Sequence, residues 1–190
     1  MASSSRNTGG GQLAQECPGS VPGDPAGAAC LCERVIDEMK AIFGDDQRRI
    51  AHALKVLEYA DAMLQSEEQE VFGLVVRAAA ILHDIGIHEA ERKHGSSSGR
   101  LQELEGPPIA REILERLGVD AEVVDHVCRI VANHHSAKDI DTPEFRIVWD
   151  ADWLVNIPDE FDTSNEARIA RLIDRVFKTE GGRRLAGRVF

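Results

Sequence analysis

The most apolar stretch of the chain runs from Val71 to Leu82 and leads directly into the polar pair His83-Asp84. Apolar residues occupy nearly every face of a helix over this stretch, so the pattern predicts a buried, central helix rather than an amphipathic one. Buried histidine and aspartate need compensating partners. We expect Gly86 to end this helix, and a metal ion at its last turn would satisfy both side chains.

Helical spacing of apolar residues predicts further helices on both sides of this stretch. Ser66 with Gln69 is a suitable capping box for the central helix, and Pro107-Pro108 stand where a following helix is expected to begin. The polar segment from Ile87 to Glu105 is expected to be a loop. Alternating strand patterns are absent, so we predict an all-α fold of about seven helices. Besides the central one, the expected helices span residues 31–43, 45–65, 109–117, 120–133, 142–158 and 163–176.

Composition divides the chain into a tail and one domain. Residues 1–29 are rich in Ser, Gly and Pro and lack an apolar period, which predicts a flexible N-terminal tail before a single domain over 30–190. No stretch has the roughly 18 uninterrupted apolar residues of a membrane span, and the N-terminus lacks the order of a secretory signal. We therefore expect a cytoplasmic protein that does not contact membranes.

The net charge limits the kinds of binding partner, and the number of cysteines indicates the redox state of the thiols. The formal net charge of −11 disfavours bulk nucleic acid, although small anionic substrates are compatible with a locally positive site. The four cysteines do not form a disulfide framework in a chain of this length, and we expect reduced thiols. These cysteines are Cys17, Cys30, Cys32 and Cys128.

Several histidines and carboxylates lie inside apolar helices or at their ends. Each taken alone is more typical of a hydrogen-bonded core residue than of a ligand. Convergence of all of them on one interior point would be unfavourable unless a cation collected them. Imidazole with carboxylate favours iron, manganese, cobalt or nickel, while zinc and magnesium are also compatible. The residues are His52, His83, Asp84, His134, His135, Asp150 and Asp152.

The ordered set of His52, His83-Asp84, His134-His135 and the Ala-Asp-Trp-Leu sequence around Asp152 resembles the HD superfamily of metal-dependent phosphohydrolases. The resemblance covers roughly residues 52–156 and implies a helical bundle with the metal site at its centre. It implies that His52, His83, Asp84 and Asp152 hold one metal. The leucine two positions after Asp152 favours this aspartate over Asp150, which either orients a ligand or a basic group or faces solvent.

Family members with two metals have additional histidines, and His134-His135 resembles their His-His pair. Glu105 occupies the region where such members commonly carry another histidine, and it could supply an oxygen ligand or merely favour a helix N-terminus. One and two metals therefore both stay open. Trp153 stands where relatives often have a basic residue, and it is either a stacking surface or part of the core.

The resemblance implies phosphoester hydrolysis by metal-activated water, with a nucleotide as the commonest substrate. Asp84 would orient the water, and His88 or His94 would protonate the leaving group. Two alternatives remain, namely a diiron oxygenase of the same fold and a metal-binding regulatory module without turnover. A homo-oligomer is also compatible with the sequence. The expected substrate contacts are Lys55, Lys138 and Asn156.

Overall fold

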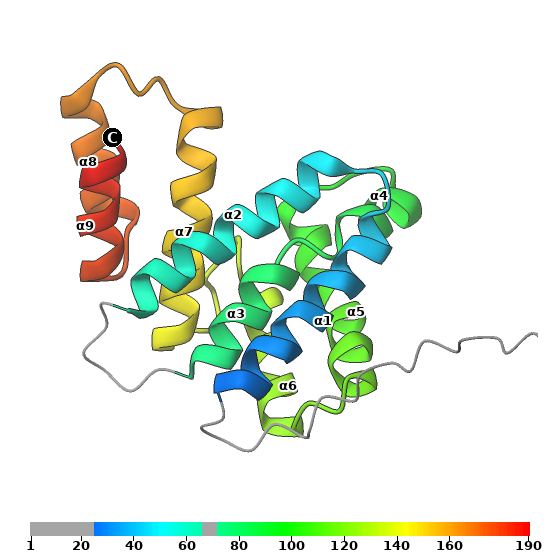
Figure 1. Cartoon of the computed structure of the whole chain (residues 1–190). Helices are drawn as coiled ribbons and strands as arrows, with labels where there is room; N and C mark the ends of the chain where they lie inside the picture. The colour runs from blue at the N-terminus through cyan, green and yellow to red at the C-terminus, as the bar shows by residue number, and fades with distance from the viewer. Residues whose placement is uncertain (1–24, 66–71) are drawn as a thin grey trace, which may run out of the picture.

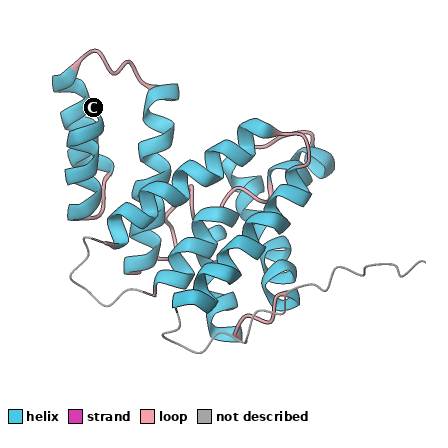
Figure 2. Ribbon diagram, viewed as in Figure 1, coloured by secondary structure: helices cyan, strands magenta, loops and turns pink. Residues whose placement is uncertain are grey.

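The structure, a computed structural model, describes residues 25–65 and 72–190. Over these residues the chain is helical and contains no strand, which confirms the all-α class (Figures 1 and 2). Nine helices are present in these two ranges, where about seven were expected. They are α1 (Pro25–Phe43), α2 (Gln47–Leu64), α3 (Gly73–Leu82), α4 (Ile87–His94), α5 (Gly99–Arg116), α6 (Ala121–Val131), α7 (Pro143–Glu160), α8 (Glu166–Val176) and α9 (Glu180–Val189).

Helix α3 forms the centre of the bundle. It packs against α1, α2, α6 and α7, and every residue from Val75 to Leu82 is buried except Arg77. Arg77 is accommodated because its Nε donates to Asp61 Oδ1 of α2 at 2.6 Å. The prediction of a buried central helix is therefore confirmed, and the His83-Asp84 turn that follows it lies inside the bundle.

Side-chain caps fix the starts of the helices that flank α3. Asp46 Oδ1 accepts from Arg49 N at the start of α2, and Thr142 Oγ1 accepts from Phe145 N ahead of Pro143 in α7. Such caps satisfy backbone N–H groups that have no partner within the helix. The expected capping box at Ser66 and Gln69 lies outside the described residues. Helix α1 begins at Pro25, so the last residues of the expected tail are helical.

The expectation of a loop over residues 87–105 is wrong. The segment contains α4 and the first turns of α5, and Pro107 and Pro108 lie within α5 rather than at its start. A tertiary contact explains the difference. A Cβ added to Gly86 would lie 2.5 Å from Gly106 N, so α5 approaches the turn after α3 backbone to backbone. This close packing outweighs the unfavourable helix propensity of the prolines.

Helices α8 and α9 lie at one side of the bundle, next to α7 (Figure 1). Helix α8 is capped by Asn165, not by Thr163 or Ser164, and α7 continues past Pro158 to Glu160. Helix α9 was not expected from the sequence, because Gly181 and Gly182 disfavour a helix.

Asp150 stabilises the connection between α8 and α9. Its fully buried carboxylate accepts from Lys178 N at 2.8 Å, and from Thr179 N and Thr179 Oγ1, both at 2.7 Å. Burial raises the pKa of Asp150 to about 6, against the effect of these hydrogen bonds. The expectation that Asp150 faces solvent is therefore wrong. Its hydrogen bonds go to residues 178 and 179 and not to a predicted metal ligand, and Arg183 is the basic group whose charge acts on it.

The cysteines differ among themselves. Cys30 is disulfide-bonded, so the expectation of reduced thiols is wrong for this residue, whereas Cys32 and Cys128 are free and buried. Burial raises the pKa of both free thiols, which disfavours the reactive thiolate. None of the described helices is both long enough and apolar enough to cross a bilayer.

Candidate metal centre

Two buried helices end in turns that present a histidine in the same way. His83 follows α3, and its Nδ1 lies 2.9 Å from the carbonyl oxygen of Ala80. His134 follows α6, and its Nδ1 lies 2.7 Å from the carbonyl oxygen of Val131. A carbonyl oxygen only accepts hydrogen bonds, so Nδ1 carries the proton in both rings. Their Nε2 atoms are thereby left without a proton and directed inward, where they could bind a metal ion.

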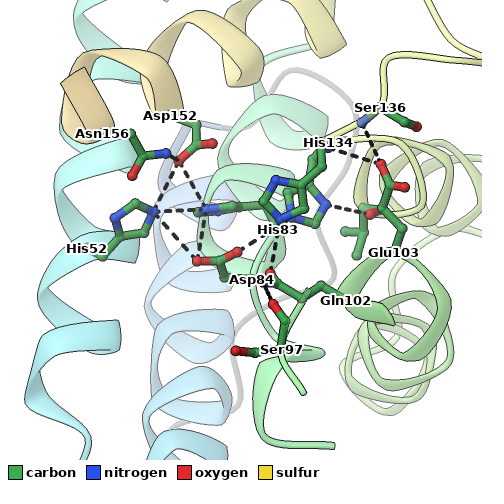
Figure 3. A network of polar contacts seen from close by, with 12 residues as sticks. His52, His83, Asp84, Ser97, Gln102, Glu103, His134, Ser136, Asp152 and Asn156 are labelled. Atoms are coloured by element: carbon green, nitrogen blue, oxygen red, sulfur yellow. Dashed lines mark hydrogen bonds and ion pairs between the residues drawn. The ribbon is translucent and has the colours of Figure 1, made fainter. Parts of the chain in front are cut away.

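The first group of potential ligands consists of His52 of α2 with His83 and Asp84 of the turn after α3, and Asp152 of α7 lies beside it (Figure 3). The Nε2 atoms of His52 and His83 are 3.1 Å apart, and Asp152 Oδ1 lies 3.1 Å and 3.5 Å from them. Asp84 Oδ2 lies 3.7 Å from His52 Nε2 and 3.6 Å from His83 Nε2. Two imidazoles and two carboxylates thus face one point, as the sequence predicted, and their role as ligands stays a prediction.

A second group shares Asp84 with the first. Asp84, His134 and His135 offer ligand atoms within 4.8 Å of one another, and His134 Nε2 lies 3.5 Å from Asp84 Oδ1. His134 Nε2 is buried and has no hydrogen-bond partner among the described residues. Such an atom is unfavourable unless an unseen group satisfies it. A cation between His134 and Asp84 would satisfy this nitrogen. Asp84 Oδ2 would then belong to the first group and Asp84 Oδ1 to the second.

The electrostatics of the centre favour a positive ion. Burial opposes the charged form of His83, but Asp84 and Asp152 outweigh it and raise the pKa of His83 to about 9. Burial likewise opposes ionisation of Asp84 and Asp152, yet the neighbouring histidines hold both carboxyl pKa values well below their ordinary range. A positive charge beside the two carboxylates is therefore favourable, and a bound cation would supply it.

A cleft of about 560 Å³ leads to the centre. His52, Asp84 and Asp152 lie along it, together with His135 and Asn156. Asn156 Nδ2 donates to Asp152 Oδ1 at 2.8 Å and orients that carboxylate (Figure 3). The remaining wall is largely charged or polar. It includes Asp159 and Glu160 of α7, the expected Lys55, and three further residues from α2 and α5. These further residues are Arg48, Arg49 and Gln102.

The two histidines of α4 that were expected to protonate the leaving group are directed away from the two ligand groups. His88 Nε2 lies 3.1 Å from Asp46 Oδ2, and the ring packs edge-on against Phe43. His94 Nε2 lies 2.8 Å from Glu105 Oε1. Both histidines belong to helix α4, where the sequence predicts a loop, so the sequence does not indicate their directions.

Glu105 is not a member of either ligand group. Besides the contact with His94, its Oε2 accepts from Lys93 Nζ at 2.6 Å, so both carboxylate oxygens are used to join α4 to α5. These two partners hold the pKa of Glu105 below its ordinary value. The expected role of Glu105 as a ligand therefore has no support in this geometry.

Two more expected positions lie elsewhere. Lys138 borders a separate surface hollow together with Arg129 and Lys178, not the cleft at the metal centre. Trp153 is partly buried in a row of aromatic rings, 6.2 Å from both Trp149 and Phe161 between ring centroids. Trp153 thus packs with the core.

Sequence reasoning missed Gln102 and Glu103 of α5. Glu103 Oε1 accepts from His135 N at 3.0 Å and from Ser136 N at 2.7 Å. Gln102 Oε1 lies 3.1 Å from His135 Nε2. No apolar periodicity marks their segment, so the sequence predicts a loop there and gives no sign of these two contacts. Partial desolvation of the ring and the nearby His134 lower the pKa of His135, although the residue as a whole is exposed.

The structure is an all-α bundle with histidines and aspartates at its centre that could hold a metal ion. The family model for the HD domain matches residues 49–178, so the chain belongs to the HD domain family. Members of this family are generally metal-dependent phosphohydrolases. No curated protein and no solved structure matches the chain significantly.

Proposed function

We propose that the protein is a metal-dependent phosphohydrolase that acts on a small phosphorylated substrate, with a nucleotide as the first class to test. One observation carries the proposal: the two oxygens of Asp84 face different histidine groups, beside a cleft that also contains basic side chains. Both groups offer imidazole and carboxylate atoms, which fit a divalent transition metal such as manganese, iron, cobalt or nickel.

Chemistry supplied by bound divalent cations would be a lowered pKa of a bound water and polarisation of a phosphoryl oxygen. The side chains of the protein have separate tasks. Asp84 and Asp152 keep their negative charge inside the bundle, and Asn156 holds Asp152 in one orientation. His83 and His134 are held with Nε2 inward by carbonyl groups of their own helices. The centre is therefore organised before any substrate arrives.

Substrate binding is assigned to the wall that α2 contributes to the cleft. Arg48, Arg49 and Lys55 bring positive charge to this wall, whereas Asp159 and Glu160 of α7 line the same cleft and Asp159 lies 4.0 Å from Arg48. The positive charge on α2 would attract phosphate oxygens to this wall despite the overall negative charge of the chain. Lys55 Nζ is 2.8 Å from Glu58 Oε1, a pair at the surface that a phosphate could replace. No described feature of the cleft selects a particular base or number of phosphates.

The test is phosphate release by purified protein with Mn²⁺ from nucleoside mono-, di- and triphosphates and from simple phosphomonoesters. The expected result is turnover that Asp84→Asn abolishes and that His126→Ala retains. His126 is a suitable control because its Nε2 contacts Thr142 Oγ1 and it belongs to neither ligand group. Equal loss of turnover in both variants would contradict the assignment of the centre.

A second candidate, a diiron oxygenase, is favoured by the carboxylate shared between two histidine-rich groups. It predicts visible absorbance from bound iron and oxygen uptake that depends on an organic substrate, without phosphate release. A regulatory module that only binds metal predicts neither reaction. Measuring oxygen consumption beside phosphate release on the same iron-loaded and manganese-loaded samples separates these functions.

A further inference from the structure

The first turns of α5 contact His135 in three different ways. Glu103 Oε1 accepts hydrogen bonds from the backbone N–H groups of His135 and Ser136. A Cβ added to Gly99 would lie 2.7 Å from His135 Cγ, so the imidazole packs directly on the Gly99 backbone. Gln102 completes the set through its contact with His135 Nε2. Residues 99, 102 and 103 share one helix face, which we call the α5 cradle.

The contacts of Gln102 fix the orientation of its amide group, because the NH₂ end donates hydrogen bonds and the oxygen end accepts them. Its Nε2 lies 2.6 Å from the carbonyl oxygen of Ser97 (Figure 3). A carbonyl oxygen accepts only, so the amide NH₂ must face Ser97 and the amide oxygen must face His135. An amide oxygen also accepts only. The proton of a neutral His135 ring is therefore placed on Nε2, and Nδ1 keeps the lone pair.

His135 thus differs from the other histidines of the centre. Nδ1 carries the proton in His83 and His134, because each Nδ1 faces a carbonyl oxygen of its own helix. Those two rings are oriented by the helix that carries them. The orientation of His135 depends instead on a separate helix, α5, whose contacts with α4 and α6 hold it against the centre.

We propose that Gln102 is a positioning residue that sets the tautomer of His135, so that His135 offers Nδ1 to the second cation group while His83 and His134 offer Nε2. This inference rests on the proposed metal centre but not on the reaction catalysed there. Gln102 acts through His135, and the α5 cradle makes the second group dependent on the docking of α5. Among the described residues, no hydrogen bond joins α5 to His52 or His83, the histidines of the first group.

The experiment uses the full chain and two readouts. Two-bond ¹H–¹⁵N NMR spectra of the metal-free protein report which nitrogen of each ring carries the proton, with the His135 signals assigned from a His135→Gln variant. Titration with Mn²⁺ alone, followed by electron paramagnetic resonance, gives the number and affinities of the bound ions. Neither readout requires phosphate release, so failure of the proposed function and failure of this inference are distinguishable.

Three variants are compared. Gln102→Met keeps the length of the side chain but accepts no strong hydrogen bond, so the Nε2–H form of His135 should lose its preference. Loss of such an orienting partner typically weakens metal affinity roughly 10–100-fold, and only the second Mn²⁺ should weaken. Gln102→Glu keeps an acceptor for Nε2–H and should retain the tautomer. Arg100→Ala, an exposed change in the same turn, should match the wild type in both readouts.

Unchanged affinity of the first Mn²⁺ shows that the variants are folded. A wild-type His135 with its proton on Nδ1 would overturn the inference. The same holds if Gln102→Met leaves the tautomer unchanged. A tautomer change without weaker binding of the second Mn²⁺ would overturn the positioning role of Gln102.

Discussion

Replacing Gly86 by alanine tests how the turn that carries Asp84 is packed. Gly86 has φ −78°, an angle that any residue adopts, so backbone freedom is not the reason for glycine here. An added Cβ would meet Gly106 N at 2.5 Å, Gln102 O at 2.7 Å and Gly106 Cα at 2.8 Å. All three atoms belong to the backbone of α5, so no side-chain rotation can relieve the contact.

The size of the effect follows from these distances. The closest contact is about 0.9 Å shorter than the 3.4 Å at which ordinary contact begins, so α5 must shift by roughly that amount. Overpacking of this kind typically costs about 1–3 kcal/mol. For a chain of this size that corresponds to a Tm lowered by roughly 2–12 °C. The shift would also move Gln102 away from His135 and weaken binding of the second cation.

Gly187→Ala is the matched control. Gly187 lies within α9, and an added Cβ meets nothing within 4 Å. Alanine is favoured over glycine in a helix, so this variant should be more stable by about 0.5–1 kcal/mol. Urea unfolding of both variants gives the free energies. Equal stability of Gly86→Ala and the wild type would refute the argument that α5 packs backbone to backbone on this turn.

Three further predictions concern single side chains. Asp150→Ala should lower the free energy of unfolding by about 1–3 kcal/mol, because the amide groups that Asp150 accepts from become unsatisfied, while the number of bound metal ions stays unchanged. Glu105→Gln should also leave the metal number unchanged, whereas loss of a metal ion in elemental analysis would restore Glu105 as a ligand. Lys55→Ala should raise KM for a phosphorylated substrate several-fold with little change in kcat, and Lys138→Ala should change neither; equal effects in steady-state kinetics would contradict the placement of substrate on α2.

The sequence indicates which side chains of the candidate centre face inward, because these residues belong to strongly periodic helices or follow them. His52 and Asp152 lie on helices whose apolar faces are evident, and the spacing of such residues fixes which side chains face inward. His83 and His134 follow apolar runs at the ends of buried helices, so they could be placed without knowledge of the packing. The structure brings His52, His83 and Asp152 together and places His134 in the second group, on the other oxygen of Asp84.

The parts that could not be predicted depend on tertiary contacts. Helix α4 is short and polar, and α5 contains two prolines, so neither has the pattern of a helix. Their positions are set by the approach of Gly106 to Gly86, which no local pattern reveals. The directions of His94 and Glu105, and the contact between Gln102 and His135, therefore needed the structure. Helix α9 was missed for the same reason, since its glycine-rich start packs against the buried Asp150.

The sharing of Asp84 between two cation groups is tested most directly by counting metal ions. Elemental analysis of manganese-loaded wild type and Asp84→Asn, after removal of free metal, gives the number bound per chain. The account predicts two ions in the wild type and loss of both in the folded variant, because both groups contain Asp84. Retention of two ions by Asp84→Asn, or a wild type that binds none, would contradict it.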